Sequence, residues 1–278
     1  MRDESYSDIH RGDAPILVAA PHIGTAIPAD LMSESVWRSV EGRGADAAGA
    51  MLRAVAAARG ISCIAGRIHP CVIDFNVAAG NRMLYSGLET NLCRTHTARG
   101  ESLYRDVGGP SDSEVTRRIE QYWMPYHEEL GSELQRLRRM HDNVLLLVSH
   151  AGSRLSPYPQ QFGVSDCNVG TSRGASCDRR LVTTLTGVVR DGGRSWVVNG
   201  RMADTFAAQH YGVPAAGIHV MEVEFAGDIR QDCEGGGADC AVTRGLFELM
   251  LDGFLETLST LPNVEVTARA ELGFRPNG

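Results

Sequence analysis

Histidines and carboxylates stand where a folded chain could bring them together for chemistry. His22 lies in the segment PHIGT directly after an apolar run, and His150 follows the apolar run VLLLVS. Glu222 and Glu224 alternate with apolar residues and therefore share one face of a predicted strand. Asp46 stands near the start of a helical pattern. Because ligands of open α/β sheets bind at the carboxyl ends of the strands, we expect this edge to carry the chemistry.

Imidazole and carboxylate side chains that converge from separate strand ends are typical of catalytic zinc sites. Such a site uses two imidazoles and a carboxylate as ligands and leaves a fourth position for water. A further glutamate nearby would transfer the proton. Imidazole is a poor ligand for magnesium, so zinc is expected, with manganese, iron or cobalt as alternatives.

Each of these residues also has a simpler interpretation. His22 follows Pro21 and would serve equally well as a histidine that caps a turn. Separately, one of Glu222 and Glu224 would serve only as a solvent-facing or ion-paired carboxylate. The residue types alone therefore suggest a metal centre without proving it.

Short β-rich runs alternate with longer helical patterns, which predicts parallel strands joined by crossover helices. The runs predicted as strands cover residues 16–20, 61–65, 71–75, 144–149, 196–199 and 217–225. Asp74 and Asn76 end the third of these runs. We expect about eight strands and six helices in a single three-layer α/β domain, with a mixed, mostly parallel central sheet flanked by helices.

The predicted helices cover residues 35–59, 113–140, 177–190 and 241–258, and Pro125 should kink the second of them. Gly60 is a plausible stop for the first helix. Residues 76–112 and 151–176 are predicted as long loops, which in a compact domain usually serve function. The domain is expected to span residues 1–278, with residues 1–14 and 268–278 as loose termini.

The composition of the chain excludes several classes of function. The net charge of -7 argues against nucleic acid as a partner, because phosphate binding needs a concentrated basic face. The longest apolar run is far shorter than the roughly 20 residues of a membrane helix, and the polar N-terminus lacks a secretory signal. The seven cysteines include no CxxC pair, as expected of structural thiols in a reducing compartment. We therefore expect a cytoplasmic enzyme with a small-molecule substrate, and a homodimer is the default assembly.

The segments ILVAAPHIGTAIPADL, VIDFN, SLYRD, YWMPYHEEL, LLLVSH, DCNVGTSRGASC, VNGRM and QHYGVPAAGIHVMEVE occur in the order and spacing of one known family. The chain resembles the N-formylglutamate amidohydrolases, which are similar in fold to zinc carboxypeptidases and succinylglutamate desuccinylase. This resemblance implies that His22, Asp46 and His150 bind the metal. It also implies that Glu224 is the general base and acid.

Other positions depart from the family pattern. The arginine that usually follows the family's asparagine, here Asn76, is replaced by Val77. Ala203 and Gln209 stand where the family carries lysine and arginine. Since neither valine nor glutamine can hold a carboxylate as a guanidinium does, we expect that N-formylglutamate itself is not the substrate. Arg82 is a candidate to bind the substrate carboxylate instead.

The sequence thus predicts a metal-dependent amidohydrolase that cleaves a small N-formyl or N-acyl compound. Glu224 would move the proton, and Arg201 would help to stabilise the oxyanion. Arg82, Asn76, Arg201 and Glu222 are the expected substrate contacts. A carboxypeptidase-like or ester-cleaving metallohydrolase is an alternative. Another is a non-catalytic metal-binding homologue, because Val148 and Ala151 alter the surroundings of His150.

Overall fold

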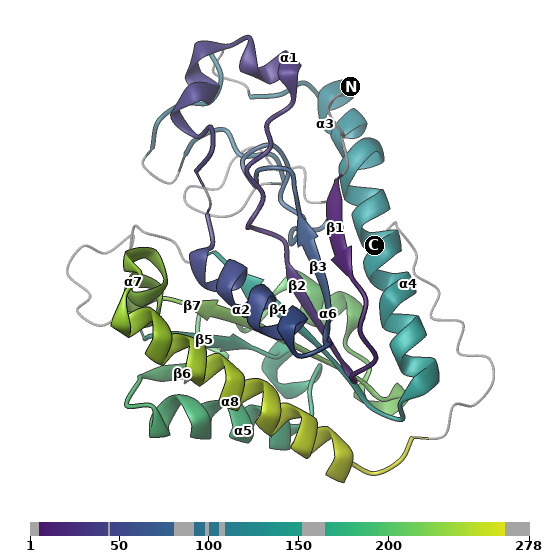
Figure 1. Ribbon diagram of the computed structural model, residues 1–278. Helices are drawn as coiled ribbons and strands as arrows, with labels where there is room; N and C mark the ends of the chain where they lie inside the picture. The colour runs from purple at the N-terminus through teal and green to yellow at the C-terminus, as the bar shows by residue number, and fades with distance from the viewer. Residues whose placement is uncertain are drawn as a thin grey trace.

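The central sheet organises the fold, as the computed structural model in Figure 1 shows. The structure describes residues 6–43, 45–80, 92–97, 100–105, 109–151 and 165–264. Its seven described strands lie in the order β1-β3-β2-β4-β7-β5-β6. Their bounds are Ser7–His10 (β1), Ile16–Ala20 (β2), Ser62–Gly66 (β3), Val144–His150 (β4), Cys167–Gly170 (β5), Trp196–Val198 (β6) and Ile218–Phe225 (β7).

The sheet is mixed but mostly parallel. Strands β3, β2, β4 and β7 run parallel to one another, whereas β1 pairs antiparallel with β3 and β5 pairs antiparallel with β7. Strand β6 lies parallel to β5 at the far edge. Parallel strands at the centre of a sheet are covered on both faces, and β2, β3 and β7 are buried throughout, as is β4 up to its last residue. The carboxyl ends of these four central strands therefore meet at one edge.

Helices cover both faces of the sheet. The helices, with their bounds, are Ala29–Met32 (α1), Ala47–Ala58 (α2), Asp112–Arg118 (α3), Met124–Met140 (α4), Arg179–Asp191 (α5), Phe206–Tyr211 (α6), Gly227–Gly235 (α7) and Ala238–Thr260 (α8). Short 3-10 turns cover Ser35–Ser39, Ser172–Gly174 and Pro214–Ala216. Helices α2, α5, α7 and α8 pack on one face, and α3, α4 and α6 on the other.

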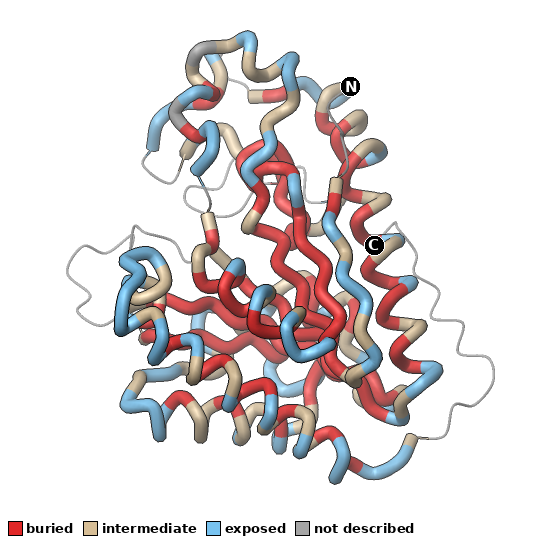
Figure 2. Tube along the Cα trace, viewed as in Figure 1, coloured by how far each residue is buried: buried red, intermediate tan, exposed pale blue. Residues whose placement is uncertain are grey.

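The central strands are buried along most of their length (Figure 2). Their side chains alternate between two hydrophobic cores, one on each face of the sheet. On β4, Leu146 points into the core under α4, and its neighbours Leu145 and Leu147 point into the core under α8. This three-layer arrangement confirms the predicted α/β fold. In the described part of the chain, none of the helices combines the length and the apolar character that a membrane crossing requires.

The N-terminal half departs from the sequence prediction at several places. Residues 7–10, expected in a loose terminus, form the edge strand β1. The predicted helix over 35–59 is divided into a 3-10 turn and α2, because Gly42 adopts a left-handed conformation (φ 69°) and Asp46 caps α2. Gly60 also has positive φ (68°), as a glycine helix stop requires. The predicted strand 71–75 is wrong: these residues form turns, since β1 already occupies the outer edge of β3.

The C-terminal half follows its predicted elements more closely, although the loop predicted over 151–176 contains β5. The long helix predicted over 113–140 forms as α3 and α4 with a π-helical turn, Ile119–Trp123, between them. Pro125 explains this turn, because proline donates no hydrogen bond and its ring clashes with the carbonyl four residues earlier. Residues 268–278, expected to be a loose terminus, lie outside the described residues.

Candidate active site

The predicted site residues gather at the carboxyl edge of the central strands. His22 follows β2 by two residues, and His150 is the last residue of β4. Glu224 on β7 lies directly beside His150 in the strand register. Asn76 comes from the turn segment that follows β3. The sheet topology, rather than any local motif, therefore brings these side chains together.

The two imidazoles are in contact. The ring centroids of His22 and His150 lie 5.4 Å apart, and the rings meet edge to face at 74°. His22 is almost fully buried, and the His150 side chain is 18% exposed. The structure thus brings together the two histidines on which the predicted metal centre depends.

Asp74 orients the ring of His22. The backbone N–H of Ala151 donates to Nδ1 of His22 (3.0 Å), so Nε2 carries the proton and donates to Oδ1 of Asp74 (2.7 Å). Oδ2 of Asp74 accepts from the Arg94 guanidinium (3.0 Å), and the backbone N–H of Asn76 donates to Oδ1 (2.9 Å). Burial alone would raise the pKa of Asp74, but His22, Arg94 and these hydrogen bonds together hold it well below its usual value. Asp74 is therefore an ionised carboxylate that fixes one tautomer of His22.

Glu222 holds the ring of His150 in a similar way. Its Oε2 contacts Nε2 of His150 and accepts from the Asn76 amide (2.6 Å), and its Oε1 accepts from the backbone N–H of Ala208 (2.7 Å). Burial would lower the pKa of His150, but the charge and hydrogen bond of Glu222 raise it above its usual value. Burial would likewise raise the pKa of Glu222, and His150 lowers it overall. The Glu222 carboxylate therefore holds Nε2 of His150 in place.

This arrangement bears on the expected substrate contacts. Glu222 is fully buried, and both of its carboxylate oxygens are bonded within the protein, so the structure places it behind His150. The amide of Asn76 contacts both members of this pair, and its side chain is buried as well. Both residues therefore position His150 in this structure. Arg82 lies outside the described residues.

Glu224 and Arg201 form an ion pair beside the two histidines. The Glu224 side chain is only 6% exposed, whereas that of Arg201 is 44% exposed. Since His150 and Glu224 are register partners on parallel strands, their side chains leave the sheet on the same face. A nearly buried carboxylate thus stands beside the imidazole pair and is ion-paired with a more exposed guanidinium.

Asp46 approaches from the opposite face of the sheet. Its Oδ1 accepts from the backbone N–H of Gly49 (2.8 Å) and caps α2, and its Oδ2 accepts from the hydroxyl of Ser149 (2.7 Å). Burial raises its pKa, although Ser149, Gly49 and the charges of both imidazoles lower it in part. Among the described residues, no three His, Cys, Asp or Glu side chains form a ready metal cage. Asp46 therefore lies near the two histidines without joining them, and its role as a ligand remains a prediction.

The donor set nevertheless suits a divalent cation. Metal-binding histidines usually donate their second ring N–H to a carboxylate, and Asp74 and Glu222 stand in that relation to His22 and His150. A cation would take Nδ1 of each ring, and at His22 it would replace the hydrogen bond that the Ala151 N–H donates to Nδ1. A carboxylate oxygen has more than one acceptor site, so Asp46 can keep its present hydrogen bonds and still bind a cation.

Sequence reasoning missed the roles of Asp74, Arg94 and Ser149. Asp74 was visible as the polar end of an apolar run, but nothing in its spacing indicated a bond to His22. Arg94 lies in an irregular segment, where no periodicity predicts a partner. Ser149 alternates with His150 on β4, and that alternation would have placed it on the opposite face toward α2.

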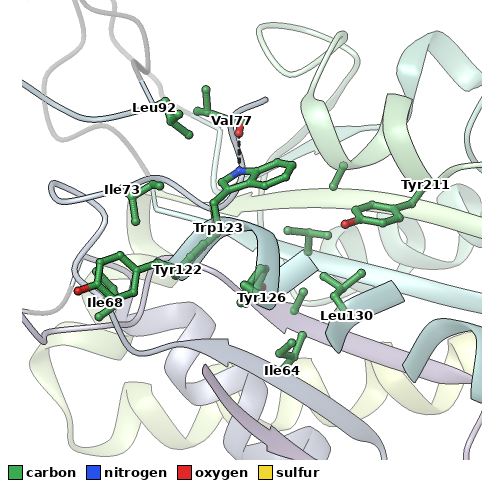
Figure 3. Packing of buried hydrophobic residues seen from close by; sticks show 14 of the residues in the cluster. Ile64, Ile68, Ile73, Val77, Leu92, Tyr122, Trp123, Tyr126, Leu130 and Tyr211 are labelled. Atoms are coloured by element: carbon green, nitrogen blue, oxygen red, sulfur yellow. Dashed lines mark hydrogen bonds between the residues drawn. The ribbon is translucent and has the colours of Figure 1, made fainter. Parts of the chain in front are cut away.

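Position 77 belongs to the hydrophobic core. The Val77 side chain is buried, and its carbonyl accepts from the indole N–H of Trp123 at 2.9 Å (Figure 3). Ile73, Leu92 and Tyr211 belong to the same cluster. Position 77 therefore supplies packing and no charge.

The model of the N-formylglutamate amidohydrolase family matches residues 14–229, a range that contains every site residue described above. The chain belongs to this family. The N-formylglutamate deformylase of Pseudomonas putida is 34% identical over 218 residues, which cover 78% of this chain and 82% of that protein. The Pseudomonas aeruginosa N-formylglutamate deformylase is 33% identical over 221 residues, with the same coverage.

Solved structures share the fold. An N-formylglutamate amidohydrolase from Ralstonia eutropha superposes with a TM-score of 0.71 at 21% identity, and the match covers 91% of this chain and 98% of that one. A gene product of Agrobacterium tumefaciens superposes with a TM-score of 0.64 at 14% identity, over 91% of this chain and 96% of that one. This member of the family is thus a hydrolase of amide bonds. Its candidate site lies at the carboxyl edge of the central strands.

Proposed function

We propose that this protein is a metal-dependent amidohydrolase that cleaves a small N-formyl or N-acyl compound related to an amino acid. The observation that carries the proposal is the pair of imidazoles in contact, each held by its own buried carboxylate. Such pairs are typical of histidines that bind a catalytic metal. His22 and His150 would hold the cation, and Asp46 would be the third ligand.

Zinc is the cation that these donors favour, and manganese, iron or cobalt would also fit. When bound by these residues, such a cation would lower the pKa of a water molecule toward neutrality and would polarise the carbonyl of the amide. Asp74 and Glu222 keep both rings in the required tautomer and orientation, because each accepts a hydrogen bond from Nε2 of its histidine.

Glu224 transfers the proton in this mechanism. Its carboxylate takes a proton from the attacking water and returns it to the nitrogen that leaves. Arg201 contacts Glu224 in the structure, and its exposed side chain can turn toward the oxyanion that develops on the amide oxygen. Because the Glu224 side chain is nearly buried, the proton is passed where bulk water has little access.

N-formylglutamate is not the substrate that we propose. The packing of Val77 in the core supports this view, because a second carboxylate on the substrate would find no guanidinium at that position. Ala203 and Gln209 likewise carry no charge. A substrate with a smaller or uncharged side chain fits these replacements better.

A turnover assay with metal analysis tests the proposal. Protein loaded with zinc is incubated with a panel of N-formyl amino acids, N-acetyl amino acids, dipeptides and esters. The products are identified by mass spectrometry. Glu224→Gln should keep the metal and lose about 10²–10⁴-fold in kcat on the amides. Glu256→Gln, an exposed change on α8, should match the wild type.

The outcomes separate the alternatives. Cleavage of formyl or acetyl amides that depends on Glu224 supports the amidohydrolase. Cleavage of dipeptides or esters alone would indicate a carboxypeptidase-like or esterase activity. Bound metal without any turnover would indicate a non-catalytic homologue, and full activity of Glu224→Gln would refute the assigned mechanism.

A further inference from the structure

We propose that His127, on helix α4, is a positioning residue for the hydrolysis reaction, because it joins the two segments that hold the ring of His150. Its effect on turnover rests on the proposed function, whereas its effect on the His150 ring rests on the structure alone. His127 lies in the segment YWMPYHEEL and is buried on the face of α4 that packs against the sheet.

Both ring nitrogens of His127 are bonded. Burial lowers the pKa of His127 to about 3, so the ring is neutral and has one N–H and one bare nitrogen. Since a carbonyl oxygen only accepts, Nε2 carries the proton and donates to the carbonyl of Phe75 (2.8 Å). Nδ1 is then the acceptor for the hydroxyl of Tyr211. His127 therefore joins the turn segment after β3 to helix α6.

The surroundings of His127 are aromatic. The ring centroids of Trp123 and Phe206 lie 3.9 Å and 5.5 Å from that of His127. A polar ring in such a cluster costs free energy unless its nitrogens are bonded, and an apolar ring would fill the same space without that requirement. The two segments that His127 joins therefore explain this histidine better than packing does.

The contact with Tyr211 leads to Glu222 through helix α6. Tyr211 is a buried side chain of the cluster against which α4 packs (Figure 3). The backbone N–H of Ala208, on the same helix, donates to Oε1 of Glu222 (2.7 Å). Ala208 and Tyr211 lie about one helical turn apart. A bond that holds Tyr211 in place therefore also holds the N–H that binds Glu222.

The contact with Phe75 leads to the same carboxylate by another route. Phe75 precedes Asn76, whose amide donates to Oε2 of Glu222 (2.6 Å) and contacts Nε2 of His150. Glu222 itself contacts Nε2 of His150. His127 thus closes a ring of hydrogen bonds behind His150. Because the members of a buried network support one another, the loss of one link should loosen the hold on His150.

Four variants separate this ring from general stability. His127→Phe keeps an aromatic side chain but breaks both links, and Tyr211→Phe removes only the hydroxyl. His127→Gln can still donate to the Phe75 carbonyl, so it should be milder than His127→Phe. The control is Leu130→Ala, which removes a buried side chain about one turn further along α4. This control should lower the melting temperature and leave kcat unchanged.

Turnover is measured on N-formyl-L-leucine and N-acetyl-L-leucine with zinc-loaded protein, well below the melting temperature of every variant. His127→Phe should lower kcat by about 3- to 30-fold, the range expected for residues that act through a packed network. KM should stay nearly unchanged, because His127 lies behind His150 and acts on its ring. Tyr211→Phe should show a smaller loss. The double variant should lose no more than His127→Phe, since both changes break the same ring.

Nuclear magnetic resonance of the metal-free protein, labelled with 15N-histidine, provides a readout that does not depend on activity. The Nε2–H proton of His150 bonds to the Glu222 carboxylate. Because the chain has nine histidines, this signal is assigned by its absence in His150→Ala. In His127→Phe it should move upfield or vanish through exchange with water, whereas in Leu130→Ala it should stay as in the wild type.

Each outcome supports or overturns the role of His127. Wild-type kcat in His127→Phe, or a loss no larger than that of Leu130→Ala, would overturn the proposal, and so would an unchanged His150 signal. If the wild type cleaves neither probe, the proposed function fails for these amides, and the His150 signal alone then decides the role of His127. If His127→Phe does not fold, Tyr211→Phe and His127→Gln decide by the same two readouts.

Discussion

Replacement of Asp74 by asparagine tests whether the Asp74 carboxylate holds His22 and its neighbours in place. Three donors converge on this buried carboxylate: Nε2–H of His22 (2.7 Å), the backbone N–H of Asn76 (2.9 Å) and the Arg94 guanidinium (3.0 Å). Asparagine offers one acceptor oxygen and one NH2 group in the same space. In either orientation of the amide, at least one donor must therefore face another donor.

The expected cost follows from these contacts. If the amide oxygen replaces Oδ1, the hydrogen bonds to His22 and Asn76 persist, and the bond to Arg94 is lost together with the charge that balances it. Loss of one charge-assisted hydrogen bond and of half a buried ion pair should lower the free energy of unfolding by about 2–4 kcal/mol. For a chain of this size, the melting temperature should fall by roughly 3–7 °C.

The assay has two readouts and a matched control. Thermal unfolding of metal-free protein measures the stability change, and competition with a chelator measures metal affinity, which should fall by about 10- to 100-fold when a residue that orients a metal ligand is replaced. Asp252→Asn removes a carboxylate that is 54% exposed and paired with Arg59, and it should cost less than about 1 kcal/mol. A variant Asp74→Asn that melts with the wild type and keeps its metal affinity would refute the role assigned to Asp74.

Further predictions concern pH, packing and metal. Burial lowers the pKa of His127 to about 3, so the native state excludes a proton that the unfolded chain binds below about pH 6.5; stability should therefore fall as the pH drops below 6.5, by up to about 1.4 kcal/mol per pH unit, and His127→Gln should flatten this slope in urea titrations. An unchanged slope would show that His127 is not responsible. Gly49→Ala would place a methyl group 2.7 Å from the Ser149 hydroxyl and closer still to Asp46, so it should lower the urea midpoint by an amount equivalent to about 1–3 kcal/mol. Wild-type stability of this variant would contradict the tight packing around Asp46. Dialysis against a chelator should abolish amide hydrolysis and added zinc should restore it, whereas activity that survives complete metal removal would rule out a metal-dependent reaction.

Much of the fold is readable from the sequence because the central strands are apolar on both faces. The runs at Ile16–Ala20 and Val144–His150 are too short and too rich in β-branched and aliphatic residues for surface helices, and each is a central strand. The edge strands are harder to predict. Strand β1, Ser7–His10, has the alternating polar character of an exposed edge, and such a pattern resembles a loop.

In the turn segment after β3 the error is the reverse: the sequence resembles a strand, but the residues form turns. Residues 71–75 are buried and, apart from Asp74, apolar, as a strand would be. They nevertheless form turns, and their apolar side chains fill the core below α4 without pairing to the sheet. Burial and strand pairing are separate properties, and composition reports only the first.

The site was predictable where strand ends determine it. His22, His150 and Glu224 follow or end central parallel strands, so topology alone predicts that they meet. Asp74 and Arg94 come from irregular backbone, and their contacts depend on the path of that backbone in space. Asp46 shows a further limit, since a helix cap and a metal ligand use the same residue type at the same kind of position.

The position of a bound cation is the most direct test of this account. Crystals of the zinc-loaded protein, measured at the zinc absorption edge, should show one strong anomalous peak about 2.0–2.1 Å from a ring nitrogen of both His22 and His150. A peak elsewhere in the molecule, or none at this pair of imidazoles, would contradict the proposed metal centre.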